Sequence, residues 1–102
     1  MMETIKLESH LGSVPKHIGK LAEFGKAVVM QLQLRAGETI PEHRTEADVL
    51  IVVQSGQAVF VFQDRQVTLD PRTLLHILPG EAHSVHAADG DAELLVIKVA
   101  RS

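Results

Sequence analysis

Residues 37–56 read GETIPEHRTEADVLIVVQSG, in which a turn leads to one histidine and then to a long apolar run that closes on a second glycine. The run Val49–Val53 is apolar at consecutive positions, which is typical of a strand covered on both faces. His43 lies between the turn and this strand, where it is a candidate metal ligand or pocket-wall side chain. The stretch therefore predicts a buried strand with one titratable side chain at its entrance.

Short apolar or alternating runs continue along the chain from residue 26, and Gly, Pro and Asp separate them. We expect further strands at 28–34, 58–62, 67–69, 74–78, 84–86 and 93–99. In the first of these, Gln31 and Gln33 alternate with apolar residues, which predicts one buried face and one partly solvent-exposed face. Residues 18–24 fit either a short helical turn or an edge strand. Strands at spacings of roughly 8–12 residues indicate an all-β sandwich or barrel.

The length and composition suit one compact domain. The chain has 102 residues, of which 45% are hydrophobic, so it can bury a core but has no room for a second domain. Its formal net charge of -3 gives no general attraction to nucleic acid or anionic lipid. The absence of cysteine excludes disulfides, thiolate zinc sites and a cysteine nucleophile. Without a signal peptide or an apolar span, we expect a cytoplasmic protein that binds neither nucleic acid nor membrane.

Two segments resemble the conserved motifs of the cupin superfamily. In residues 37–56, a glycine and His43 are separated by five residues, and a second glycine closes the motif at the spacing of the first cupin motif. In residues 69–86, the sequence ILPGEAH ends at His83 and resembles the Pro-x-Gly-x-x-His turn of the second motif, with Leu78 at the proline position. The resemblance covers about the last two thirds of the chain.

This resemblance implies an all-β double-stranded β-helix, which is a small jelly-roll cupin barrel. The whole chain, residues 1–102, would form a single cupin domain. Residues 1–25 would be an N-terminal strand and turn segment, and residues 26–100 would be the conserved barrel.

The resemblance also implies a reduced metal site. Cupin enzymes usually bind a metal through two histidines and a glutamate of the first motif and one histidine of the second. Here His43 and His83 match two of these ligands, whereas Thr45 and Val49 stand where the other histidine and the glutamate would be. Two imidazoles alone would hold a divalent transition metal such as Zn, Ni, Fe or Mn only weakly. Water, substrate or a carboxylate from elsewhere would have to complete the site.

Other titratable residues offer few replacements for the missing ligands. His86 lies three positions after His83, and side chains of a strand alternate between its faces, so we expect it to point outward. The same argument places His76 outside. Glu42 or Glu46 would complete the site only if the turn brings it back to the two histidines. Otherwise His43 and His83 are pocket-wall side chains, bonded to each other, to Thr45 or to water.

Three functions follow as hypotheses. The first is a cupin that binds a small molecule in a mostly apolar pocket with few polar groups. We predict that its lining includes His43, Thr45, Val49, Ile51, Phe60 and His83, together with Val28, Met30, Leu75 and Val85. The second is a metal-assisted dioxygenase, isomerase or lyase acting on a small substrate, with a histidine as metal ligand or general base. The third is a sensing module that acts through a partner protein, as related barrels do in some transcription regulators.

The outward side chains of the apolar strand predict an assembly. If Val49, Ile51 and Val53 face the interior, then Leu50 and Val52 face out, and large apolar side chains rarely stay in water as a contiguous patch. In cupins a neighbouring subunit often provides part of the cover, so we expect a twofold homodimer. The alternative is cover by the chain's own residues 1–25.

Overall fold

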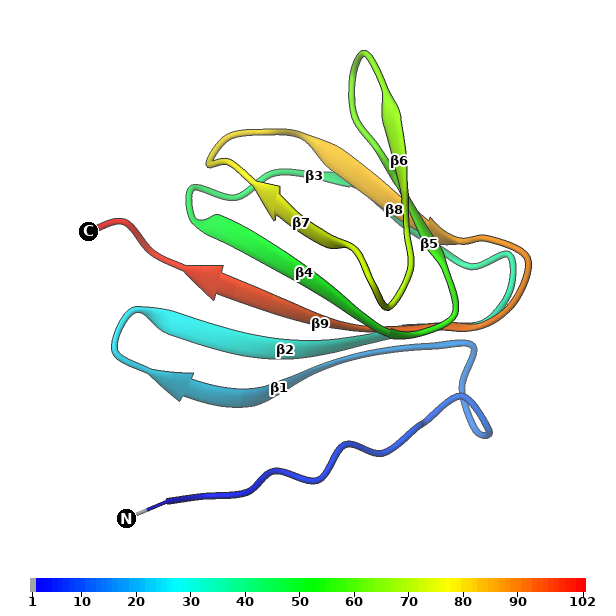
Figure 1. The fold of residues 1–102 in the computed structure, drawn as a ribbon, viewed down its shortest axis with the longest axis horizontal. Helices are drawn as coiled ribbons and strands as arrows, with labels where there is room; N and C mark the ends of the chain where they lie inside the picture. Colours follow the sequence, from blue (N-terminus) through cyan, green and yellow to red (C-terminus); the bar gives the residue numbers. More distant parts are fainter. Residues whose placement is uncertain (1) are drawn as a thin grey trace.

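Figure 1 shows the computed structural model of the chain, which describes residues 2–102. These residues form nine strands and no helix, so none of them belongs to a helix that could cross a membrane. The strands are β1 (Lys16–Phe24), β2 (Ala27–Leu34), β3 (Thr39–His43), β4 (Asp48–Ser55), β5 (Ala58–Val61), β6 (Gln66–Leu69), β7 (Leu74–Ile77), β8 (His83–Ala87) and β9 (Ala92–Val99). The all-β prediction is confirmed, and residues 18–24 belong to an edge strand rather than to a helical turn.

The strands form two antiparallel sheets. One has the order β1-β2-β9-β4-β7, and Figure 1 shows these strands stacked from β1 at the bottom to β7. The other has the order β3-β8-β5-β6, and its β5–β6 hairpin rises above the rest of the molecule. Many sheet neighbours are distant in sequence, as in the pairings of β2 with β9 and of β3 with β8. This is the topology of the predicted double-stranded β-helix.

The core lies between the inner faces of the two sheets. In β4 the side chains of Val49, Ile51 and Val53 are no more than 3% exposed, whereas Leu50 and Val52 are half-buried on the other face. Burial of each large apolar side chain contributes about 1.5–3 kcal/mol. Because both faces of β4 are apolar, the pairing of β4 with β7 and β9, and not the apolar pattern alone, determines which side chains point inward.

Gly56, the closing glycine of the first motif, ends the turn after β4. Its φ is 77°, and a Cβ atom added there would lie 2.0 Å from the carbonyl oxygen of Asp91. Only glycine has both the backbone freedom and the small volume that this approach requires. The turn therefore holds the end of β4 against the start of β9.

The N-terminal segment crosses the outer face of β2. The side-chain amides of Gln31 and Gln33 both donate to the carbonyl oxygen of Glu8 at 2.9 Å. Arg35 donates through its guanidinium to the carbonyl oxygen of Leu11, which is itself 5% exposed. Both glutamines are buried as a result, so the prediction of a solvent-exposed face was wrong at these two positions. A long-range contact with an irregular segment covers them.

Candidate functional site

The structure brings His43 and His83 together at one end of the barrel. His43 ends β3, His83 begins β8, and the two residues are register partners in the pairing of these strands. Their ring centroids are 4.5 Å apart. His83 is buried, with 4% of its surface exposed, whereas His43 is exposed. One imidazole is therefore inside the cavity and the other is at its mouth.

Each imidazole is oriented by a backbone carbonyl two residues earlier in the chain. The Nδ1 atom of His43 lies 3.0 Å from the carbonyl oxygen of Pro41, and that of His83 lies 3.0 Å from the carbonyl oxygen of Glu81. A carbonyl can only accept, so Nδ1 carries the proton in both rings. The Nε2 atom of each neutral ring then has a free lone pair, and no residue of 2–102 donates to it.

His83 stays neutral over a wider pH range than an ordinary histidine. Burial lowers its pKa, and the charge of Lys98 and the protonated form of His43 act in the same direction. The hydrogen bond to Glu81 opposes this shift but does not cancel it. No side-chain nitrogen or oxygen that is fully buried within residues 2–102 lacks a partner, so the unpartnered Nε2 opens onto accessible space. His83 therefore presents a hydrogen-bond acceptor to the cavity.

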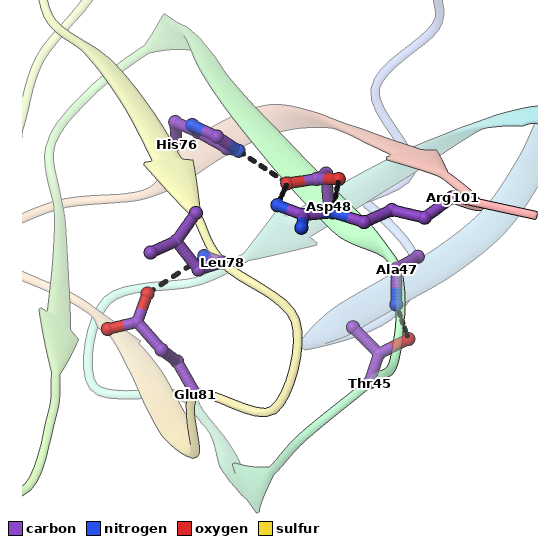
Figure 2. Close-up of polar contacts among 7 residues, drawn as sticks. All are labelled: Thr45, Ala47, Asp48, His76, Leu78, Glu81 and Arg101. Atoms are coloured by element: carbon purple, nitrogen blue, oxygen red, sulfur yellow. Dashed lines mark hydrogen bonds and ion pairs between the residues drawn. The ribbon is translucent and has the colours of Figure 1, made fainter.

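Hydrogen bonds fix the two loops that carry the histidines. The amide of Gly80 donates to the carbonyl oxygen of Thr45 at 2.8 Å. Figure 2 shows the amide of Ala47 donating to the Thr45 hydroxyl oxygen, and the Glu81 carboxylate accepting from the amide of Leu78. The carboxylate of Glu81 thus closes its own turn, and a free hydroxyl hydrogen remains on Thr45.

A cavity of about 120 Å³ lies beside the histidines. Of the ten residues predicted for the pocket, eight line it, among them His43, Thr45, Val49, Ile51, Phe60 and His83. Met30 and Val85 also line it, but Val28 and Leu75, which the alternation placed in the pocket, do not. The walls are mostly apolar, and the polar or charged lining residues are Gln31, His43, Thr45, His83 and Lys98.

Sequence reasoning missed Lys98 as a lining residue. The side chains of Ala92, Leu94 and Val96 alternate inward along β9, and the same alternation places Lys98 on the inner face. Its register partner in β4 is Val49. Within residues 2–102, no aspartate or glutamate lines the cavity or forms an ion pair with Lys98. The period-two pattern of residues 92–99 was the signal that could have identified it.

The side chains present do not fit the four-ligand metal centre of cupin enzymes. Two free Nε2 atoms with carbonyl-bonded Nδ1 atoms are suitable ligands. However, residues 2–102 contain no group of three His, Cys, Asp or Glu side chains that could hold a metal ion, so neither Glu42 nor Glu46 completes the site. Val49 offers no lone pair, and the positively charged residue Lys98 lines the same cavity. The donor set and its charge both disfavour a bound cation.

A second polar cluster lies outside the cavity. Asp48 begins β4 and accepts from Arg101 at 2.7 Å and from His76 at 2.8 Å (Figure 2). The hydrogen bonds from Arg101 and then His76 hold the pKa of Asp48 well below its usual range. His76 points outward, as the parity argument predicted. This cluster joins β4, β7 and the end of the chain, and takes no part in the cavity.

Comparison with known proteins supports the same fold. A cupin superfamily protein from Desulfitobacterium hafniense superposes with a TM-score of 0.77 at 22% identity, covering 94% of this chain and 84% of that protein. An RmlC-like cupin from Methanocaldococcus jannaschii, described as a double-stranded β-helix, gives 0.81 at 16% identity, with coverages of 98% and 93%. The DMSP lyase DddQ from Ruegeria pomeroyi gives 0.76 at 18% identity, with coverages of 95% and 52%.

Sequence comparison identifies the family. No curated protein matches the sequence. Residues 29–101, which extend from β2 to the residues after β9, match the AraC-like ligand binding domain. The chain is therefore a small cupin domain and belongs to the AraC-like ligand binding domain family.

Proposed function

We propose that this protein binds a small molecule in the cavity beside His43 and His83. The observation that carries the proposal is the pair of free Nε2 acceptors at one end of an apolar cavity. Ligand sites commonly combine apolar walls with a few convergent polar groups that fix the ligand's orientation. The two imidazoles would orient the ligand, and Val49, Ile51 and Phe60 would contact its apolar part.

The size of the cavity limits the buried part of the ligand. An apolar protein cavity of roughly 150 Å³ holds one benzene molecule. The cavity here, at about 120 Å³, would therefore hold a group of about that size or slightly smaller. Because His43 is exposed at the mouth, a larger ligand would extend past it into solvent.

Binding is better supported than metal-assisted catalysis. The family is described as a ligand binding domain, and the reduced donor set lacks the side chains of a complete metal centre. A role in sensing is compatible with this proposal, because an effector-binding barrel needs a pocket and not a catalytic metal.

A titration with a library of small fragments, followed by amide chemical shifts, tests the proposal. We expect shifts at residues that line the cavity, and weaker binding in His83→Gln. His86→Gln is the matched control, because His86 lies on the same strand and its side chain is on the opposite face. Fragments that shift only residues outside the cavity, or bind both variants equally, would argue against this site.

We also propose that the protein forms a homodimer through the outer face of the five-stranded sheet. Val52 is the register partner of Leu74 in β7 and of Leu95 in β9, and Leu50 is the partner of Ile97. These side chains form one apolar patch over β7, β4 and β9, with Leu74 64% exposed. Contiguous apolar surface of this kind usually marks an interface. A second copy would cover it.

A further inference from the structure

The cavity's only charged lining residue among 2–102 is a lysine. Lys98 lies on the inner face of β9 and has no acidic partner within these residues. Lys98 as a whole is half-buried, and no neighbouring carboxylate among residues 2–102 neutralises its charge. It is therefore a ready partner for an anionic group of a ligand.

Lys98 also lies next to a position where this chain departs from the metal-binding cupin pattern. Its register partner is Val49, which occupies the position of the metal-binding glutamate. Relative to that pattern, the site has lost a negative side chain and carries a positive one on the neighbouring strand. The charge preference of the cavity is thus reversed, from a cation to an anion.

The polar groups of the cavity divide into donors and acceptors. Lys98 is a charged donor, and the hydroxyl hydrogen of Thr45 is free to donate because its oxygen already accepts from Ala47. His43 and His83 are acceptors at Nε2, because each Nδ1 hydrogen is bonded to a carbonyl. A carboxylate alone would place oxygen lone pairs against the lone pairs of the imidazoles. A complementary ligand needs an anionic acceptor for Lys98 and a separate donor for the histidines.

We propose that the cavity binds a small hydroxycarboxylate, whose carboxylate pairs with Lys98 and whose hydroxyl donates to the Nε2 atom of His83. The apolar remainder of the ligand contacts Ile51 and Phe60. The inference rests on the proposed function, since it names the class of ligand for that same cavity. The small volume places the carboxylate and hydroxyl within a few bonds of each other.

Three compounds of nearly equal size distinguish the contribution of the ligand's carboxylate from that of its hydroxyl. The compound 2-hydroxybutanoate has both groups, butanoate lacks the hydroxyl, and 1,2-butanediol lacks the carboxylate. Amide chemical shifts of the full chain at pH 7.5 and fixed ionic strength would give the three dissociation constants. We expect 2-hydroxybutanoate to bind most tightly, with butanoate about fivefold weaker and the diol at least about tenfold weaker, as expected for one neutral and one charge-assisted hydrogen bond.

Variants assign the charge effect to Lys98. Lys98→Met should weaken 2-hydroxybutanoate at least about tenfold while leaving the diol unchanged within about twofold. Lys26→Met is the matched control, because it makes the same change in net charge and Lys26 is exposed in the hairpin between β1 and β2. Amide spectra of both variants show whether the fold is retained, and Lys98→Gln provides a second, polar replacement.

The outcomes separate this inference from the proposed function. If the diol binds in the cavity as tightly as 2-hydroxybutanoate, or if Lys98→Met and Lys98→Gln leave the affinities unchanged, the hydroxycarboxylate inference is overturned and the binding function stands. If neither the three compounds nor the fragment library shifts residues of the cavity, both proposals are overturned.

Discussion

The amide of Gly80 donates a hydrogen bond of 2.8 Å to the carbonyl oxygen of Thr45, and this bond joins the two loops that carry the histidines. Gly80 adopts a φ of 84°, which favours glycine, and no atom lies within 4 Å of the position of an added Cβ. Backbone conformation alone, without a packing constraint, thus explains glycine at this position of the second motif.

Alanine substitutions at Gly80 and Gly56 should lower the free energy of unfolding by different amounts. Both glycines have positive φ, but an added Cβ at Gly56 would lie 2.0 Å from the backbone of Asp91. We expect Gly80→Ala to lower the free energy of unfolding by about 1–2 kcal/mol, the cost of the left-handed conformation. Gly56→Ala should cost more than about 4 kcal/mol or prevent folding. Urea denaturation measures both, and equal losses would contradict the close backbone approach at Gly56.

The buried His83 should make stability depend on pH. Its pKa in the folded state is lowered from the ordinary value of 6.5, chiefly by burial. Below that value the unfolded chain binds more protons, so the free energy of unfolding falls as the pH falls, by at most about 1.4 kcal/mol per pH unit. Below the folded-state pKa of His83, its contribution to the free energy of unfolding no longer falls. Above pH 6.5, His83 does not make the free energy of unfolding depend on pH.

Urea denaturation between pH 7.5 and 5 measures this dependence. His83→Gln should be less sensitive to pH across the window, because it removes the titrating group. His86→Gln should keep the wild-type slope, since its side chain is on the other face of β8. A slope that is unchanged in His83→Gln would show that other groups cause the pH dependence.

Metal content should be well below one ion per chain in protein purified without chelator or added metal. The reason is the donor set, which has two imidazoles, no carboxylate and a nearby lysine. The Thr45→His/Val49→Glu variant supplies the two missing ligands and should gain metal and metal-dependent thermal stability. Elemental analysis checks both proteins. Near-stoichiometric metal in the wild type, lost in His43→Ala/His83→Ala, would contradict the anion-selective cavity.

The apolar patch should mediate self-association. Val52→Lys places a charge between Leu74 and Leu95, so we expect it to convert a dimer into a monomer while the far-ultraviolet spectrum stays unchanged. Thr68→Lys is the control, because Thr68 is exposed on β6 of the other sheet. Sedimentation velocity over a range of concentrations gives the mass. A wild-type chain that is monomeric throughout would refute the dimer.

Much of the fold followed from local patterns in the sequence. The glycine and histidine spacings of the two motifs indicated the double-stranded β-helix, and the consecutive apolar residues Val49–Val53 indicated a strand covered on both faces. Met30 and Val85, which alternation placed in the pocket, line the cavity. Alternation failed for Leu75, which packs against the core without lining the cavity, and for Val28, which does not line it.

The features that the sequence did not reveal depend on long-range contacts. The pairing of Val49 with Lys98 requires β9 to insert between β2 and β4. The burial of Gln33 requires residues 8–11 to return to β2. Neither of these arrangements leaves a periodic signal along the chain.

The glutamines under the N-terminal segment also restrict how two sheets can stack. The backbone carbonyls of Glu8 and Leu11 accept hydrogen bonds from the side chains of Gln31, Gln33 and Arg35. Residues 8–11 therefore cover this end of β2. In the proposed dimer, the second copy would therefore pack over β4 and β7 rather than over β2. Residues 8–11 would thus limit the area of this sheet on which the second copy packs.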